Sequence, residues 1–239
     1  MRWILFIAIM LLSAGARADN LALRVAPVLI DVAAPGRSAQ LTLRNEHKVK
    51  LNVQLRIFKW VQNQSGDRLL ETDDVAVSPP MMTLAPNVEY VARIVRTAKP
   101  AAIAEESYRL LVDQIPEPET SGNRTVSFVI RQSIPVFFGA ARTTLPDVSW
   151  SIRHDTQAYV LAASNSGTKR LRIAKLTLND SRGAVLVERK GLVGYVLGGS
   201  QASWAFPAAR GHVARGPFRL RAESETEAID VSLALQPAH

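Results

Sequence analysis

The chain has 239 residues, of which 47% are hydrophobic and 21% charged, so it can bury a sizeable core and is not a disordered protein. It contains no cysteine, which excludes disulfides, thiol catalysis and metal sites built on cysteine. The formal net charge is +8, and such a basic balance suits nucleic acid, an anionic surface or an acidic partner.

Residues 1–18 have the form of a targeting segment. Arg2 is followed by the apolar run Trp3–Leu12, and the small residues Ala16 and Ala18 follow, which predicts a cleaved secretory signal. The run is shorter than the roughly 20 residues of a membrane-spanning helix, and no later stretch replaces it, so we expect no membrane insertion. The expected mature chain has 221 residues (239 minus 18) and is exported, which makes nucleic acid the least expected partner.

The remaining sequence has a hydrophobic period of two. Leu41 and Leu43 alternate with polar residues, and Val53, Leu55 and Ile57 repeat the pattern. Alternation of this kind predicts half-buried strands, because successive side chains of a strand point to opposite faces. In chain order, the segments with this pattern are 21–25, 40–44, 52–58, 90–95, 108–112, 159–163, 171–178, 185–187 and 229–235.

Turn signals separate these segments. They are Ala34-Pro35-Gly36, Gln64–Asp67, Pro79-Pro80, Ala85–Asn87, Ser121–Asn123, Asn165–Gly167 and Leu197–Gly199. Many short strands separated by turns predict an all-β sandwich or barrel. The stretch Gly139–Pro146 has the composition of a link between two sandwich-sized parts, so we expect domains at 19–140 and 141–239.

Catalytic and metal-binding chemistry has little support in the sequence. The adjacent carboxylates Asp73-Asp74 and Glu105-Glu106 would point to opposite faces of a strand and form no acid/base pair. The histidines are scattered and lack a second ligand at metal spacing. They are His47, His154, His212 and His239. We therefore expect no enzyme, no cofactor and no metal.

The segment 124–130 is unusually apolar on one face. Val126, Phe128 and Ile130 share that face, while the other face carries Thr, Ser and Val. The pattern fits a core strand with one wet face, and it also fits an edge strand that donates large apolar side chains to a partner. Periodicity alone does not separate these two interpretations.

Several short motifs follow one another along the chain. They are Val28–Asp31 with Pro35-Gly36, Leu41–Asn45, Ser78-Pro79-Pro80, Leu84–Pro86 with Val91–Ile94, Glu106–Leu110 through Gln114–Pro116, Val126–Ile130, and Asn165–Gly167 followed by Leu171–Leu178. In this order, the chain resembles the periplasmic chaperones of chaperone–usher pili over nearly its whole mature length. The resemblance is specific in the first half and looser in the second, and it points to a divergent, non-classical branch.

The resemblance implies two immunoglobulin-like β-sandwich domains in tandem, set at an angle with a cleft between them. It implies that the chain binds pilus subunits, whose own fold lacks one strand, and lends them a strand of its own in the periplasm. Val126, Phe128 and Ile130 would fill the open groove of the subunit. An outer-membrane usher would receive the subunits, and the free chaperone could self-associate through the exposed strand.

The sequence departs from the family where the subunit is anchored. Better-known members bind the subunit's C-terminal carboxylate with two basic residues, but Pro27 and Pro135 align with those positions, and proline carries neither charge nor N–H. Arg131, Arg93 and Arg24 are then the candidate anchors, because a guanidinium binds a carboxylate well.

Glu106 matches a family glutamate that forms an ion pair between the two domains, and it is therefore the candidate interdomain contact. The position of its basic partner is Gly139, and Arg142 could replace that partner.

Two other functions remain as alternatives. An exported immunoglobulin-like adhesion or ligand-binding module would carry its function on loops. An enzyme is the least favoured class, because no nucleophile, base and orienting group are clustered.

Overall fold

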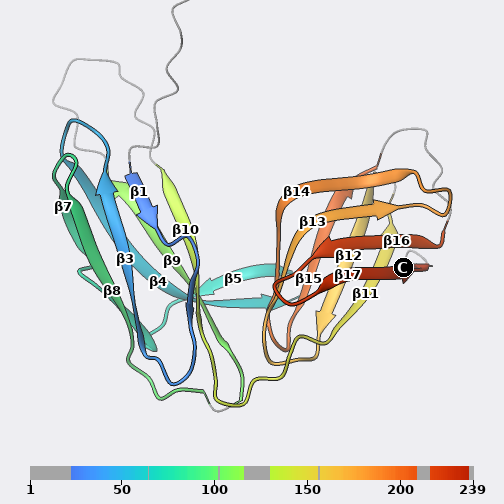
Figure 1. The fold of residues 1–239 in the computed structure, drawn as a ribbon, viewed down its shortest axis with the longest axis horizontal. Helices are drawn as coiled ribbons and strands as arrows, with labels where there is room; N and C mark the ends of the chain where they lie inside the picture. Colours follow the sequence, from blue (N-terminus) through green and yellow to red (C-terminus); the bar gives the residue numbers. More distant parts are fainter. Residues whose placement is uncertain are drawn as a thin grey trace, which may run out of the picture.

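The structure is a computed structural model that describes residues 23–63, 65–101, 103–115, 130–155, 157–208 and 216–236. These segments form eighteen strands, and none of them forms a helix long and apolar enough to span a bilayer. Figure 1 shows the strands in two groups that lie side by side, with their strands running in different directions. The molecule therefore has the two-sandwich, all-β fold that the sequence predicts.

The first sandwich contains the strands of the N-terminal half. They are β1 (Leu23–Ala26), β2 (Ile30–Val32), β3 (Ser38–Asn45), β4 (Leu51–Asn63), β5 (Gly66–Leu70), β6 (Val75–Ser78), β7 (Met81–Leu84), β8 (Glu89–Arg96), β9 (Glu106–Ile115) and β10 (Arg131–Phe138). One sheet has the order β1-β3-β8-β6, and the other has the order β2-β10-β9-β4-β5 with β7 beside β4. The chain passes from the first sheet to the second between β1 and β2, at Pro27.

The predicted alternation accounts for the buried faces of β3, β4 and β8, whereas β9 and β10 are buried on both faces over most of their length. Leu41 and Leu43 of β3 face Val53 and Leu55 of β4 in one core, and all four are almost fully buried. Burying a side chain of this size contributes about 1.5–3 kcal/mol, so the alternating pattern is the main source of stability.

The second sandwich contains the remaining strands. They are β11 (Val148–His154), β12 (Ala158–Asn165), β13 (Leu171–Asn179), β14 (Val185–Val196), β15 (Gln201–Pro207), β16 (Phe218–Glu223), β17 (Ala228–Leu233) and β18 (Leu235–Gln236). They form two four-stranded sheets, β15-β12-β11-β18 and β14-β13-β16-β17, around a separate core. The pairing of β13 with β14 is interrupted by register shifts, which mark bulges.

A buried asparagine ends a strand in each sandwich. The side-chain amides of Asn45 and Asn165 donate to the carbonyl four residues further on and to a carbonyl of a distant strand. Their side-chain oxygens accept the N–H two residues further on. Each asparagine thus satisfies main-chain groups that would otherwise be buried without partners.

The two sandwiches meet through a small apolar cluster. Trp60 of β4 and Phe137 of β10 pack against Tyr195 of β14 and Leu197, and all four side chains are at most 4% exposed. We call these four residues the joint cluster. In Figure 1 the hairpin of β4 and β5 points from the first sandwich toward the second at this place.

Candidate functional site

Strand β10 has an outer edge that is only partly paired. It pairs with β9 along its whole length, from Arg131 to Phe138, but with β2 only over Val136–Phe138. The outer edge of Arg131–Pro135 therefore has no strand beside it among the described residues. A free edge presents unpaired N–H and C=O groups, so it can accept a strand from another chain.

The segment predicted to pair with a partner leads directly into this edge. Ile130 is half-buried, and its carbonyl accepts a hydrogen bond from the Gln114 N–H at 3.2 Å. Val126 and Phe128 lie outside the described residues. Because Ile130 precedes β10 directly, the predicted pairing segment and the free edge are continuous in the chain.

Strands β4, β9 and β10 turn one face away from the first core and toward the joint cluster. Residues opposite one another in antiparallel strands share a face, so the register defines its members. We call this the joint face. It consists of Gln54, Arg56, Phe58 and Trp60 of β4, Ser107, Arg109, Leu111 and Asp113 of β9, and Arg131, Ser133, Pro135 and Phe137 of β10. It carries three arginines and one aspartate.

Asp113 is the one carboxylate of the joint face. It accepts hydrogen bonds from Arg131 Nε and, at 2.7 Å, from an Arg56 terminal nitrogen. Burial alone would raise the pKa of Asp113, but the bonds from Arg131 and Arg56 outweigh this effect and hold the pKa below its usual range. Arg56 and Arg131 are therefore already paired.

Arg109 differs from the other two arginines of this face. The centre of its guanidinium lies 3.7 Å from the centroid of the Trp60 ring and 6.0 Å from that of Tyr195. No carboxylate among the described residues forms an ion pair with it. Burial lowers the pKa of Arg109, but an arginine remains charged at neutral pH. The stacked ring holds the guanidinium plane in place, and the Asp67 carboxylate is near enough to oppose the effect of burial on the pKa of Arg109.

Arg170 forms the ionic contact between the two sandwiches. This arginine precedes β13 and is 2% exposed, and it donates to Glu105, to Asp31 at 2.6 Å and to Glu225 at 3.4 Å. It also lies 3.8 Å above the Phe137 ring of the joint cluster. Burial would lower the pKa of Arg170, but Glu105 and Asp31 outweigh it and raise the pKa, so the group stays charged.

The prediction that Glu106 makes the interdomain contact is therefore corrected by one residue. Glu106 forms its ion pair at 2.9 Å with Arg96, which belongs to the same sandwich, whereas Glu105 contacts Arg170. The reason is that Glu106 begins β9, beside the end of β10, while Glu105 lies just before the strand and reaches outward. Arg96 also donates weakly to the Gly139 carbonyl, at 3.5 Å, next to the position expected to hold the basic partner.

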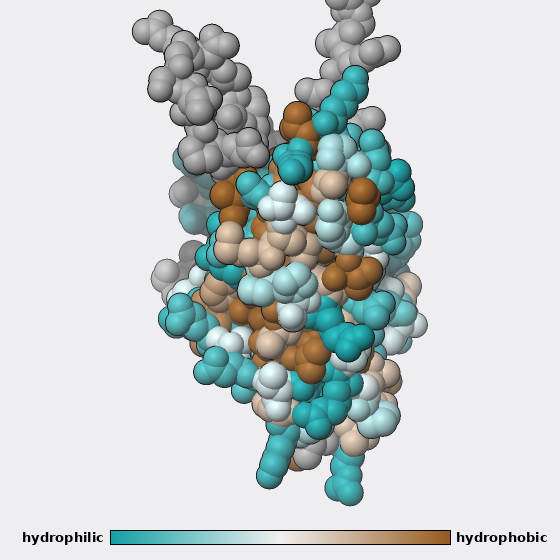
Figure 2. Space-filling model, turned by 90° about the vertical axis from the view of Figure 1, so that its left-hand side faces the viewer, coloured by the Kyte–Doolittle hydropathy of each residue, from teal (hydrophilic) through white to brown (hydrophobic). Residues whose placement is uncertain are grey.

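The three predicted anchors lie in two different places. Arg24 and Arg93 are exposed on the sheet β1-β3-β8-β6, which does not contain β10, and Arg24 approaches Glu46 at 3.9 Å. Figure 2 views the molecule from the side of the first sandwich and shows hydrophobic residues interspersed among hydrophilic ones. Arg131 lies on the joint face but is bound to Asp113.

Arg109 is the cation that sequence reasoning missed. Arg109 lies directly opposite Pro135 in the β9–β10 register. Pro135 aligns with a position that is basic in better-known members of the family, so Arg109 places a cation beside that position. In the sequence, Arg109 is an ordinary polar residue of an alternating strand. Only the pairing of residues 26 positions apart brings it beside Pro135.

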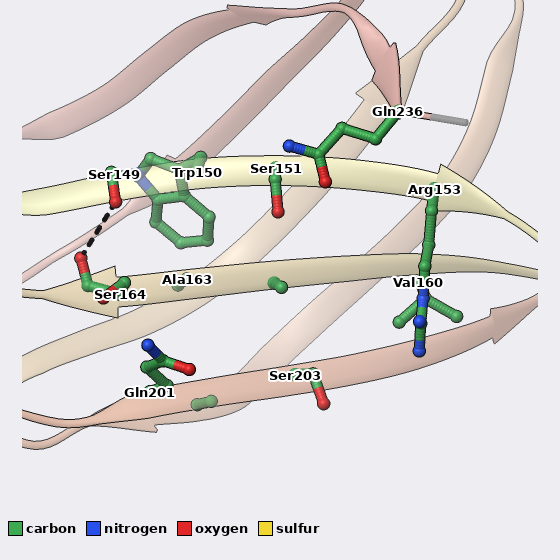
Figure 3. Close-up of a pocket in the computed structure, with 12 residues that line it drawn as sticks. Ser149, Trp150, Ser151, Arg153, Val160, Ala163, Ser164, Gln201, Ser203 and Gln236 are labelled. Atoms are coloured by element: carbon green, nitrogen blue, oxygen red, sulfur yellow. Dashed lines mark hydrogen bonds between the residues drawn. The ribbon is translucent and has the colours of Figure 1, made fainter. Parts of the chain in front are cut away.

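The second sandwich has a broad hollow on one sheet, drawn in Figure 3. Serine and alanine side chains of β11, β12 and β15 line it together with Trp150 and with Gln236 of β18, and the Ser149 hydroxyl donates to the Ser164 carbonyl at 3.4 Å. Among the described residues that line it, Arg153 is the charged one. Within the described residues, no group of three histidines or carboxylates could hold a metal. The hollow thus offers no acid/base pair and no ligand set.

Two β-sandwiches, with a strand edge that no described strand covers beside a basic face, define a class of protein in which strand addition from another chain is a known binding mode. Residues 22–142 match the family described as "Pili and flagellar-assembly chaperone, PapD N-terminal domain", and they make up about half of the chain. The chain therefore belongs to this family, whose members are chaperones and not enzymes. A comparison with curated protein sequences found no significant match.

Several solved structures share the fold. A chain of the CsuC–CsuE chaperone–tip adhesion subunit complex of archaic Csu pili from Acinetobacter baumannii has a TM-score of 0.69 at 21% identity, with 91% of this chain and 100% of that chain covered. The Escherichia coli chaperone DraB has a TM-score of 0.61 at 17% identity, with 89% and 96% covered. A chain of the Salmonella enterica SafA pilin–SafB chaperone complex has a TM-score of 0.62 at 15% identity, with 90% and 97% covered.

Proposed function

We propose that this protein is a periplasmic chaperone that stabilises pilus subunits by adding a strand to their incomplete fold and then delivers them to an outer-membrane usher. The observation that carries the proposal is the free outer edge of Arg131–Pro135 in β10, directly after Ile130. The targeting pattern of residues 1–18 supports the periplasmic location. The division at residues 140 and 141 is part of the proposal, and it falls between β10 and β11.

The strand addition would use both the main chain and the side chains of the donor. The edge of β10 supplies N–H and C=O groups, and Val126, Phe128 and Ile130 supply apolar side chains for the subunit's groove. Full burial of three such side chains would contribute roughly 5–9 kcal/mol before the costs of ordering and association are subtracted.

The test of the donor segment is a double substitution. Phe128→Asp with Ile130→Asp should abolish co-purification of pilus subunits from the periplasm, because two charges cannot enter an apolar groove. The matched control is Val88→Asp with Val91→Asp, which places the same charges on exposed side chains of the first sandwich. Normal capture by the Phe128/Ile130 variant, with mass spectrometry identifying the bound chain, would reject strand donation.

We propose further that Arg109 binds the C-terminal carboxylate of the subunit in place of the basic residues replaced by Pro27 and Pro135. A subunit strand paired with the edge of β10 would end near Pro135, and Arg109 lies directly across the register. Of the other candidates, Arg131 is already bound to Asp113, and Arg24 and Arg93 lie on the other sheet. Arg109 forms no ion pair within 4.0 Å among the described residues, and a guanidinium can bind a carboxylate through two hydrogen bonds.

Substitution of Arg109 tests this anchor. Arg109→Ala should weaken subunit binding about 10- to 100-fold, the value of one charge-assisted interaction, while Arg93→Ala should change it little. A subunit with one residue added after its C-terminus, which moves the carboxylate, should bind the wild-type protein and Arg109→Ala equally. If the extended subunit still binds the wild-type protein more tightly than Arg109→Ala, then Arg109 does not bind the carboxylate.

A further inference from the structure

One glutamine side chain bridges the two sandwiches at the joint. Gln62, near the end of β4, donates from Nε2 to the Tyr195 carbonyl at 3.0 Å, and its Oε1 accepts the Leu197 N–H at 2.8 Å. The same Nε2 donates to Asp67 Oδ1 on β5 at 2.8 Å. The amide thus bonds to β14 as a neighbouring strand would, and the β5 carboxylate fixes its orientation.

The two residues that hydrogen-bond to Gln62, Tyr195 and Leu197, pack against the side chains of the joint face. Tyr195 and Leu197 belong to the joint cluster, and the Tyr195 ring centroid lies 5.6 Å from that of Trp60 and 5.7 Å from that of Phe137. Trp60 carries the guanidinium of Arg109 on its ring. Phe137 lies on β10, two residues beyond Pro135, where the free edge ends.

We propose that Gln62 is a positioning residue, which fixes the second sandwich against the first and thereby holds Arg109 and the free edge of β10 in the geometry that binds a subunit. This inference rests on the proposed function. It adds that the binding face is formed before the subunit arrives, because the bridge and the joint cluster exist in the free chain. Preorganisation of this kind strengthens binding by removing the ordering cost from the association step.

The chemistry of the bridge requires an amide at this position. A glutamate in place of Gln62 would have the same shape, but a carboxylate cannot donate to the Tyr195 carbonyl, and it would face the like charge of Asp67. Methionine has a similar length and offers neither a donor nor a strong acceptor. Gln62→Glu therefore removes the bond to the Tyr195 carbonyl but can keep the one from the Leu197 N–H, whereas Gln62→Met removes both. A third substitution, Gln201→Glu on β15, is a matched control on an exposed strand position.

The test measures interdomain order and subunit binding in the same proteins. Because the chain has no native cysteine, spin labels can be attached at Gln40→Cys in β3 and Ser232→Cys in β17, both exposed. Both Gln62 variants should broaden the distance distribution from electron spin resonance. They should also weaken binding of the subunit that co-purifies with the wild-type protein about tenfold, whereas Gln201→Glu should change neither. Saturation with that subunit should narrow the distribution again.

Each outcome decides the question. Weaker binding with an unchanged distance distribution would mean that Gln62 does not act through domain orientation, and the inference would be wrong. Unchanged binding with a broader distribution would show that orientation does not matter for capture, which also overturns it. If the wild-type protein itself captures no subunit, the proposed function fails, and this is distinguishable because the wild type is measured first.

Discussion

Among the described residues, Arg96 and Arg170 are almost completely buried. In each case a carboxylate and an aromatic ring offset the cost of burying the charge. Arg96 pairs with Glu106 and lies 4.6 Å above the Phe138 ring, while Arg170 pairs with Glu105 and lies above Phe137. A buried charge is tolerated only with an opposite charge and hydrogen bonds nearby, and the aromatic face adds a further attraction. Of the two arginines, only Arg170 lies at the joint between the sandwiches.

Arg170→Met should destabilise the protein by about 3–5 kcal/mol, because it leaves the carboxylate of Glu105, a side chain that is 3% exposed, without its cation. The double variant Arg170→Met with Glu105→Gln should recover part of this loss, since no buried charge then remains unpaired. Urea unfolding followed by circular dichroism measures both. A double variant less stable than Arg170→Met would contradict the explanation.

The ion cluster of Asp113 should make stability depend on pH. The folded-state pKa of Asp113 lies below its unfolded value of about 3.9, so the cluster stabilises the protein above that pH and the contribution is lost as pH falls through the folded pKa. Asp113→Asn should therefore be less stable than the wild type at pH 7, and the difference should shrink at pH 3. Equal differences in urea midpoint at the two pH values would refute this.

At the scale of elements, β10 combines two roles along one strand. Its C-terminal part, Val136–Phe138, is paired on both sides, and its N-terminal part, Arg131–Pro135, is paired only with β9 among the described strands. The strand contributes Ile134, Val136 and Phe138 to the first core, which anchors it. A strand anchored in this way can present a free edge without dissociating from its own sheet.

Hydrogen exchange should report the use of that edge. In the complex with a pilus subunit, exchange of the β10 amides between Arg131 and Ile134 should slow, because the outward N–H groups gain partners, while the edge strand β17 should be unchanged. Peptide-level mass spectrometry of the free and bound protein measures this. Unchanged protection of β10 in a stable complex would mean that the subunit binds elsewhere.

At the scale of the whole molecule, the joint cluster couples the two sandwiches. Each sandwich has its own core, and the contacts that couple them include those of Trp60, Phe137, Tyr195 and Leu197 together with Arg170 and the Gln62 bridge. Trp60 is 3% exposed and contacts both Phe137 and Tyr195, which makes it central to the cluster.

Trp60→Ala should uncouple the sandwiches, so that one calorimetric unfolding transition becomes two. The first sandwich should lose about 3–5 kcal/mol, as expected for truncation of a large buried aromatic side chain, and the second should lose less. A truncation outside the joint, Trp204→Ala on β15, serves as the control that should lower stability without splitting the transition. A single transition in Trp60→Ala would show that the sandwiches are coupled by other contacts.

The secondary structure class, the two-sandwich fold and the family could all be predicted from the amino-acid sequence. Alternation at Leu41, Leu43, Val53 and Leu55 is a local property, and it predicted the buried faces of β3 and β4 correctly because these strands have one wet and one dry side. The ordered motifs likewise lie within single strands and turns. The role of Val126, Phe128 and Ile130 stays a prediction.

Which charged residues meet, in contrast, depends on how the strands pair and how the sandwiches pack. Arg109 became a candidate anchor through its register with Pro135, Glu105 replaced Glu106 as the interdomain contact, and Gln62 reached Tyr195 across 133 positions of sequence. Ion pairs and hydrogen bonds depend on distances of a few ångströms between segments remote in the chain, and no local pattern encodes such distances. Periodicity predicted only that residues 124–130 form a strand, and the order of the family motifs suggested its pairing role; neither indicates which cation lies beside it.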